Sequence, residues 1–246
     1  MKRIALMAVL ALVAGATADV LFNGGPLVNY PGQGFGGYDA SAIQTTLLEG
    51  IYGYGHALST GFRMADDFTI TDAGGWQIDT AKFFAYQTGS GTTSTINHVN
   101  VRIWSGTPGS GGTVVWGDTT TNRLASTGWS QIYRSISTSL TATNRPIMGN
   151  VANIGTTLGP GTYWMDWQTG GTLTSGPWAP PVSILDVTGP PDANAKQWNP
   201  TTSTWGPVMD TGNSTPDAMP FILNGTVIPE PASLLLLGLA ALLRRR

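Results

Sequence analysis

The chain holds two histidines, and they limit the catalytic chemistry that it can carry. His56 lies in a glycine-rich loop, and His98 lies in a segment typical of a β-strand. A serine hydrolase needs a histidine base and a carboxylate that orients it, but the nucleophile pattern Gly-x-Ser-x-Gly does not occur here. Two isolated histidines in a chain without cysteine also give no zinc-ligand cluster. We therefore expect no catalytic residue and no bound cofactor.

Aspartates are the remaining source of acid–base chemistry. Glycoside hydrolysis uses two facing carboxylates, and Glu49 is the only glutamate between residues 19 and 228. A catalytic pair would therefore consist of aspartates, drawn from Asp66, Asp67, Asp166, Asp186 and Asp210. A glycan-active hydrolase that uses such a pair is the enzymatic alternative for this chain.

Asp66 stands out because of the residues that share its side of a predicted strand. Residues 62–70 alternate, and Asp66 falls on the same side as four apolar side chains: Phe62, Met64, Phe68 and Ile70. A buried carboxylate without a partner is costly. Asp66 therefore needs an arginine, several backbone N–H donors or a hard cation such as calcium. Pairing inside the protein is the simpler expectation, and a structural calcium ion is the alternative.

Two segments combine aromatic rings with polar groups on one strand face. In residues 96–105, Arg102 and Trp104 point away from the apolar side, and in residues 161–168 Trp164 and Asp166 do the same. A flat ring beside hydrogen-bonding groups is typical of a sugar site, where the ring stacks and the polar groups fix the orientation. We expect these four residues to bind a polysaccharide. The alternative is that the rings belong to the core.

The elements that would position these residues are strands. Short runs with period-two alternation lie between clusters of turn residues, and no long amphipathic helix pattern appears. The sequence predicts one all-β domain over residues 19–228, a single β-sandwich of jelly-roll type. Within it we expect an irregular segment over 19–61 with a short helix over 40–48, and a long loop over 176–213 held by Trp178, Trp198 and Trp205. The predicted strands span residues 62–70, 76–87, 96–105, 113–116, 131–136, 147–154, 161–168, 182–186 and 220–227.

The first 18 residues have the features of a signal peptide. Lys2 and Arg3 supply positive charge, residues 4–13 are apolar, and Ala16-Thr17-Ala18 provides the small residues of a cleavage site. The apolar run is too short to span a bilayer, which needs about 20 residues. We expect an N-terminal signal helix that signal peptidase removes after export.

The C-terminus carries three features in a fixed order: Pro229-Glu230-Pro231, an uncharged apolar run over 232–243, and the final Arg244, Arg245 and Arg246. This tail resembles the PEP-CTERM sorting signal of Gram-negative bacteria. The resemblance implies a short hydrophobic helix, a transient anchor in the inner membrane and recognition by an exosortase-like enzyme. It also implies delivery to the envelope, the cell surface or the extracellular matrix. A plain C-terminal membrane anchor is the alternative.

The central domain is acidic and gives a weaker resemblance. Residues 63–70 (RMADDFTI) and 220–225 (PFILNG) loosely resemble secreted bacterial β-sandwich proteins whose activity is not assigned. Residues 19–228 hold seven basic and thirteen acidic side chains, a net charge of −6, so we expect no nucleic-acid partner. We expect a non-enzymatic surface or matrix protein associated with exopolysaccharide. A structural scaffold without a ligand is a further alternative.

Overall fold

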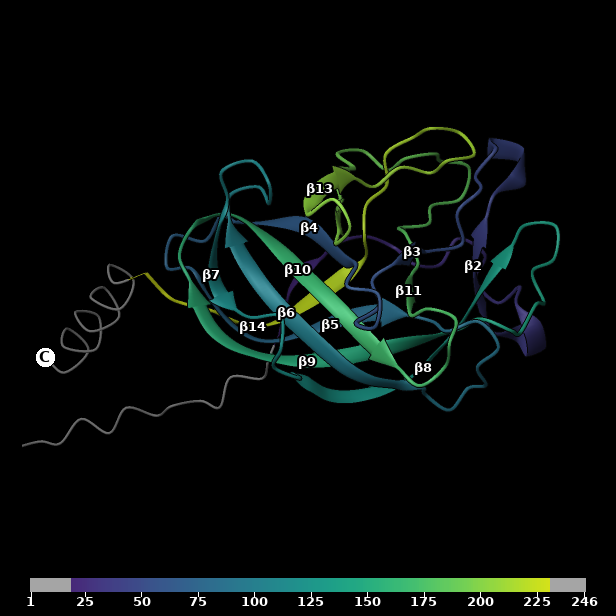
Figure 1. Cartoon of the computed structure of the whole chain (residues 1–246), viewed down its shortest axis with the longest axis horizontal. Helices are drawn as coiled ribbons and strands as arrows, with labels where there is room; N and C mark the ends of the chain where they lie inside the picture. Colours follow the sequence, from purple (N-terminus) through teal and green to yellow (C-terminus); the bar gives the residue numbers. More distant parts are fainter. Residues whose placement is uncertain (1–18, 231–246) are drawn as a thin grey trace, which may run out of the picture.

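The protein is described by a computed structural model over residues 19–230, which Figure 1 shows as strands joined by turns. Within this range the only helices are two single turns, η1 (Phe35–Gly37) and η2 (Thr45–Leu47). The all-β expectation is therefore confirmed. The signal helix expected over 1–18 and the hydrophobic helix expected over 232–243 lie outside the described residues.

The first sheet has six strands and is mixed. Five of its strands pair antiparallel, and the sixth, at one edge, runs parallel to its neighbour. In sheet order the strands are β1 (Asp19–Asn23), β14 (Phe221–Val227), β5 (Trp76–Ala85), β9 (Pro146–Leu158), β8 (Leu124–Ile136) and β2 (Asp39–Ile43).

The second sheet also has six strands and is antiparallel throughout. In sheet order these are β13 (Thr204–Pro207), β12 (Lys196–Asn199), β4 (Arg63–Ile70), β10 (Gly161–Gly171), β6 (Ile96–Ser105) and β7 (Thr113–Gly117). A separate two-stranded sheet joins β3 (Tyr54–Gly55) to β11 (Trp178–Ala179).

The main core lies between the two six-stranded sheets, which Figure 1 shows crossing each other. Alternate residues of β4, β6 and β10 face residues of β5, β9 and β14. Among the largest buried side chains are Phe83, Trp167 and Phe221, whose ring centroids lie 4.8 to 6.4 Å apart. Met64 and Val101 are fully buried on the sides that the alternation predicts. This cluster fixes which face of each strand is left for other contacts.

The β12–β13 hairpin brings its side chains over the face of the second sheet that points away from the core, the outer face. Trp104 on β6 and Trp205 on β13 are separated by three strands in the sheet order. Their ring centroids nevertheless lie only 6.2 Å apart. The β12–β13 hairpin therefore folds over the outer face; Figure 1 shows β13 next to β4, with β10 beyond it.

The N-terminal segment is more regular than we expected. β1 and β2 both belong to the first sheet, so residues 19–61 are not irregular throughout. The helix expected over 40–48 is wrong, because this stretch forms β2 and the single turn η2. Asn29 holds β2 on the edge that does not pair with β8. Its side chain accepts a hydrogen bond from the Ala42 N–H at 2.8 Å and donates one to the Ala42 carbonyl at 2.9 Å. Pairing with distant residues here overrides the local helix preference.

The C-terminal half also departs from expectation in two places. The strand predicted over 182–186 does not form, and this stretch is a loop. Its backbone is held by two isolated hydrogen bonds, from Val182 N–H to the Ala218 carbonyl and from Ser183 N–H to the Pro26 carbonyl, each 2.9 Å long. The long loop predicted over 176–213 instead contains β11 and the β12–β13 hairpin.

Candidate functional site

Asp166 is the centre of a buried polar network on the outer face. Its carboxylate is fully buried. One oxygen accepts a bond from Arg63 Nε at 2.6 Å. The other oxygen accepts bonds from Arg102 Nε at 2.7 Å and from Trp104 Nε1 at 2.9 Å, and lies 2.7 Å from Arg102 Nη2. Removing one partner of such a buried ion pair costs roughly 3–5 kcal/mol, because the other charge is left uncompensated.

The network continues from Arg63 to a neighbouring turn. Arg63 Nη1 donates to Asn100 Oδ1 at 2.5 Å and to Gln168 Oε1 at 3.3 Å. Gln168 Nε2 then donates to the carbonyls of Ala57 at 3.3 Å and Phe62 at 3.0 Å. Arg63 and Gln168 therefore hold the turn over residues 57–62.

The structure brings the four predicted polysaccharide-binding residues together but buries two of them. Trp164 is only 5% exposed and Asp166 is fully covered. Arg102 and Trp104 stay partly exposed. Because both side chains are buried, direct ligand contact by Trp164 and Asp166 is withdrawn. Asp166 instead acts by positioning its neighbours.

Asp66 lies on the core side of β4, as predicted, and is 5% exposed. Its carboxylate accepts the backbone N–H of Met219 at 2.6 Å and that of Asp67 at 2.9 Å. Burial raises the pKa of Asp66 to about 7, and the two N–H bonds oppose that rise. Backbone donors are thus its partners within the described residues, where no group of three or more acidic or histidine side chains converges on one point. Calcium at Asp66 stays a prediction.

Asp210 and His56, two other side chains considered for catalysis, are used for structure. Asp210 accepts backbone N–H bonds from Gly50, Ile51 and Gly212 at 2.7 to 3.1 Å. His56 is fully buried, and burial lowers its pKa to about 4. A carboxylate whose oxygens are already bonded, or a histidine closed off from solvent, has no open path to a substrate proton.

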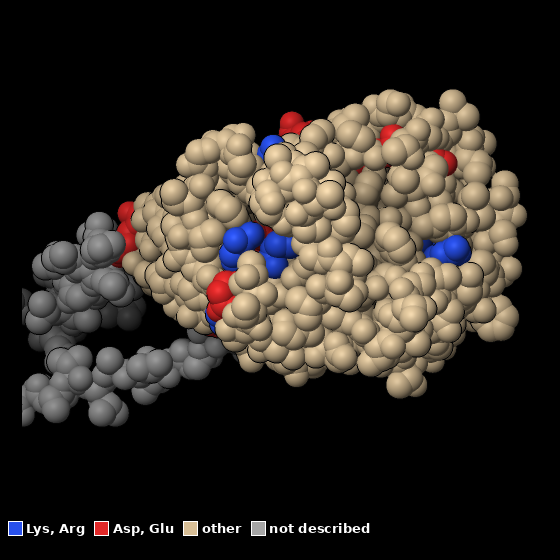
Figure 2. Space-filling model, in the orientation of Figure 1, with Lys and Arg blue, Asp and Glu red and all other residues tan. Residues whose placement is uncertain are grey.

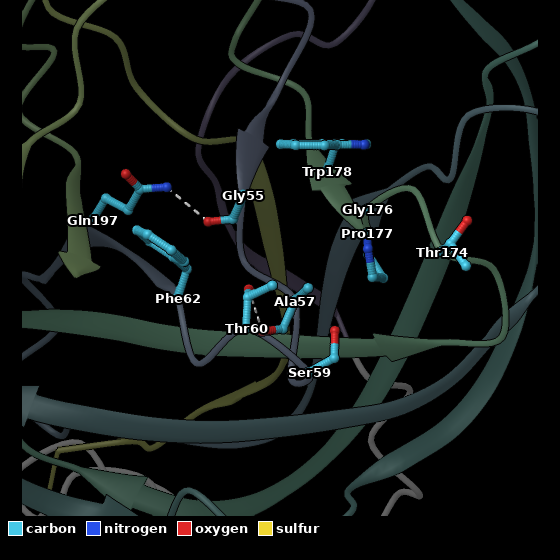
Figure 3. Close-up of a pocket in the computed structure, with 10 residues that line it drawn as sticks. All are labelled: Gly55, Ala57, Ser59, Thr60, Phe62, Thr174, Gly176, Pro177, Trp178 and Gln197. Carbon is cyan, nitrogen blue, oxygen red and sulfur yellow. Dashed lines mark hydrogen bonds between the residues drawn. The ribbon is translucent and has the colours of Figure 1, made fainter. Parts of the chain in front are cut away.

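A cleft of about 460 Å³ lies on the other side of the 57–62 turn. Figure 3 shows Phe62 and Trp178 on either side of Gly55, with the Ser59 and Thr60 hydroxyls below. Both rings are half-buried, so each presents part of its surface to the cleft. The remaining lining residues are equally free of charge: Ala57, Thr174, Gly176, Pro177 and Gln197.

Backbone pairing from distant segments builds this cleft. Trp178 on β11 pairs with Gly55 on β3, and Gln197 on β12 donates from Nε2 to the Gly55 carbonyl at 2.7 Å. Gly176 has φ of +88°, and a Cβ there would lie 2.6 Å from Trp178 Cδ1. Only glycine therefore lets the chain turn tightly beneath the indole ring.

Sequence reasoning missed the cleft residues as a site. It placed Trp178 in a loop that aromatic rings would hold in place, and it gave Phe62 to the core. The available signal was a tryptophan flanked by glycine and prolines, but nothing in the local pattern joins residues 55–62 to 174–178 and 197.

The pH dependence of stability tests the role of Asp66. Its pKa is raised from 3.8 to about 7 on folding, so the folded state favours the protonated acid. The stability that this preference contributes is complete below about pH 4 and is lost as pH rises through 7. In EDTA, the unfolding free energy of Asp66→Asn minus that of the wild type should increase from about pH 4 to 7, as measured by urea denaturation.

Asp79→Asn is the control, because Asp79 is a half-exposed carboxylate on β5 that does not contribute to the Asp66 shift. Calcium bound at Asp66 would reverse the sign of this pH dependence, because a bound cation favours the ionised form of the carboxyl group. A wild-type melting temperature that EDTA lowers, with Asp66→Asn unaffected, would establish the calcium site and contradict the internal pairing.

Comparisons with known proteins add nothing to this geometry. No family model, no curated protein and no solved structure matches the chain. Within residues 19–230, no helix is long and apolar enough to cross a membrane.

Proposed function

We propose that this chain is an exported surface or matrix protein that binds polysaccharide without cleaving it, and that the cleft between Phe62 and Trp178 takes neutral sugar units. The observation that carries the proposal is the cleft lining. It combines two aromatic rings with hydroxyl and amide groups and contains no charged side chain.

This lining fits the chemistry of a neutral sugar. The C–H face of a pyranose stacks on an aromatic ring, while its hydroxyl groups exchange hydrogen bonds with polar groups at the rim. Ser59, Thr60 and Thr174 are exposed and offer such groups. A good aromatic anchor contributes about 2 kcal/mol to binding, so Trp178 would supply a large part of the affinity.

Binding is better supported than hydrolysis. A glycosidase needs two carboxylates facing the sugar across roughly 5 to 9.5 Å. The residues that line the cleft include none, and Asp166 and Asp210 are committed to buried hydrogen bonds. The hydrolase alternative therefore has no aspartate pair placed in this cleft.

The two ends of the chain support the proposed location. Residues 1–18 would direct export and be removed by signal peptidase, and residues 229–246 would be read by an exosortase-like enzyme after anchoring in the inner membrane of a Gram-negative bacterium. Two six-stranded sheets around one core support assigning the domain to the β-sandwiches of jelly-roll type.

Trp178→Ala tests the cleft. We expect the affinity for neutral oligosaccharides, screened with glucan and mannan oligomers by calorimetry, to fall roughly tenfold to a hundredfold. Trp129→Ala is the matched control, because Trp129 is a half-buried tryptophan on the first sheet. The wild type should release no reducing ends from these oligomers. Equal binding by Trp178→Ala and the wild type, with both folded by circular dichroism, would reject the cleft as the site.

The sorting proposal is tested by intact mass. Protein recovered from the envelope or medium of an exosortase-positive host should lack Arg244, Arg245 and Arg246. Replacing Pro229, Glu230 and Pro231 with alanine should retain the protein in the inner membrane, because the apolar run remains while its recognition motif is lost. A full-length tail on exported protein would leave the plain-anchor alternative.

A further inference from the structure

A basic cluster lies on the outer face of the second sheet, on the opposite side of β12 from the cleft. Strand register places Lys196, Ala65, Asp166 and Arg102 in one row across β12, β4, β10 and β6. Ala65 is the smallest member, so no large side chain separates Lys196 from Asp166. Figure 2 shows basic side chains gathered in a recess beside the β12–β13 hairpin and β6.

The positive charge of this cluster exceeds what Asp166 neutralises. A carboxylate offers about four acceptor sites, and donors from Arg63, Arg102 and Trp104 already occupy the Asp166 oxygens. Lys196 has no ion pair among the residues that the structure describes. Two guanidinium groups thus contact one carboxylate, and the Lys196 ammonium stands two strands from it in the same row, within a domain whose net charge is −6.

One of these cations has an unused donor. Arg63 is 3% exposed, and its Nη2 has no hydrogen-bond partner within residues 19–230. A buried charged donor left without a partner is unfavourable. Its positive charge therefore adds to the excess of the cluster from beneath the surface.

The acidic side chains near the cluster do not remove the excess charge. Asp67 is half-buried on the same face of β4, in the row that contains Trp164 and Trp104. Asp118 follows β7 and accepts bonds from the Thr120 and Thr121 backbone and from Arg123 at 3.3 Å. Its charge is directed toward those donors.

Aromatic rings flank the basic groups on the same face. Trp205 lies against Trp104 at 6.2 Å and against Trp198 at 5.8 Å, between ring centroids, and all three are partly exposed. Arg102 lies over the Trp104 ring at 4.9 Å. Its side chain is 21% exposed, so the guanidinium remains open to a ligand on one side.

We propose that this cluster is a second carbohydrate site, which takes sugar units that bear a carboxylate, as in a polyuronate. The carboxylate would pair with Lys196 and Arg102, and the C–H face of the sugar would lie on Trp205. Cations beside flat rings are the combination that separates an acidic sugar from a neutral one. This site does not depend on the Phe62–Trp178 cleft.

The test uses the full chain, purified in detergent, with oligomers of polygalacturonate and their methyl esters as matched probes. Lys196→Gln should raise the dissociation constant for polygalacturonate roughly fivefold and leave that for the methyl ester unchanged, because only the ester lacks the charge. Added salt should weaken polygalacturonate binding alone. Lys82→Gln is the control, a half-buried lysine on the first sheet that should behave like the wild type.

A second variant separates this site from the cleft. Trp205→Ala should weaken binding of polygalacturonate, whereas Trp178→Ala should not. Three results would overturn the proposal: equal binding of polygalacturonate and its methyl ester, equal effects of Lys196→Gln and Lys82→Gln, or loss of polygalacturonate binding in Trp178→Ala but not in Trp205→Ala. The last result would place acidic sugars in the cleft.

Discussion

The carboxylate of Asp166 is the constraint on which the outer face of the second sheet depends. It is fully buried, and Arg63, Arg102 and Trp104 all direct donors at it. These partners come from β4 and β6, the two neighbours of β10. The ion pairs therefore fix three adjacent strands relative to one another on the face that the hydrophobic core does not reach.

The same network links the two proposed sites. Through Arg63 it reaches Gln168, whose amide holds the carbonyls of Ala57 and Phe62 and so positions the floor of the neutral cleft. Through Arg102 it presents a cation beside Trp104 on the outer face. β12 then divides the two, with Gln197 lining the cleft and Lys196 in the basic row. A protein built this way would hold neutral and acidic stretches of polysaccharide on two sides of one hairpin.

Alternation predicted the core well and exposure poorly. It placed Asp66 on the core side of β4 and separated Val101 from Arg102 on β6, and both assignments hold in the structure. It did not predict that Trp164 and Asp166 would be covered, because a two-residue period assigns a face but not what lies over it. The outer face is covered by contacts from distant parts of the chain, such as the β12–β13 hairpin whose Trp205 lies against Trp104. The cleft depends on pairing between β3 and β11, which lie more than a hundred residues apart in the chain.

The indole N–H signals of the nine tryptophans offer the most direct test of the central claim, that neutral sugars bind between Phe62 and Trp178. Trp178 lines the cleft, and its Nε1 donates to Ser175 Oγ at 3.3 Å, whereas Trp76 and Trp167 are buried in the core. Titration of the ¹⁵N-labelled protein with a neutral oligosaccharide should move the Trp178 signal to saturation and leave those of Trp76 and Trp167 in place. Saturable binding that leaves the Trp178 signal unmoved would contradict the account.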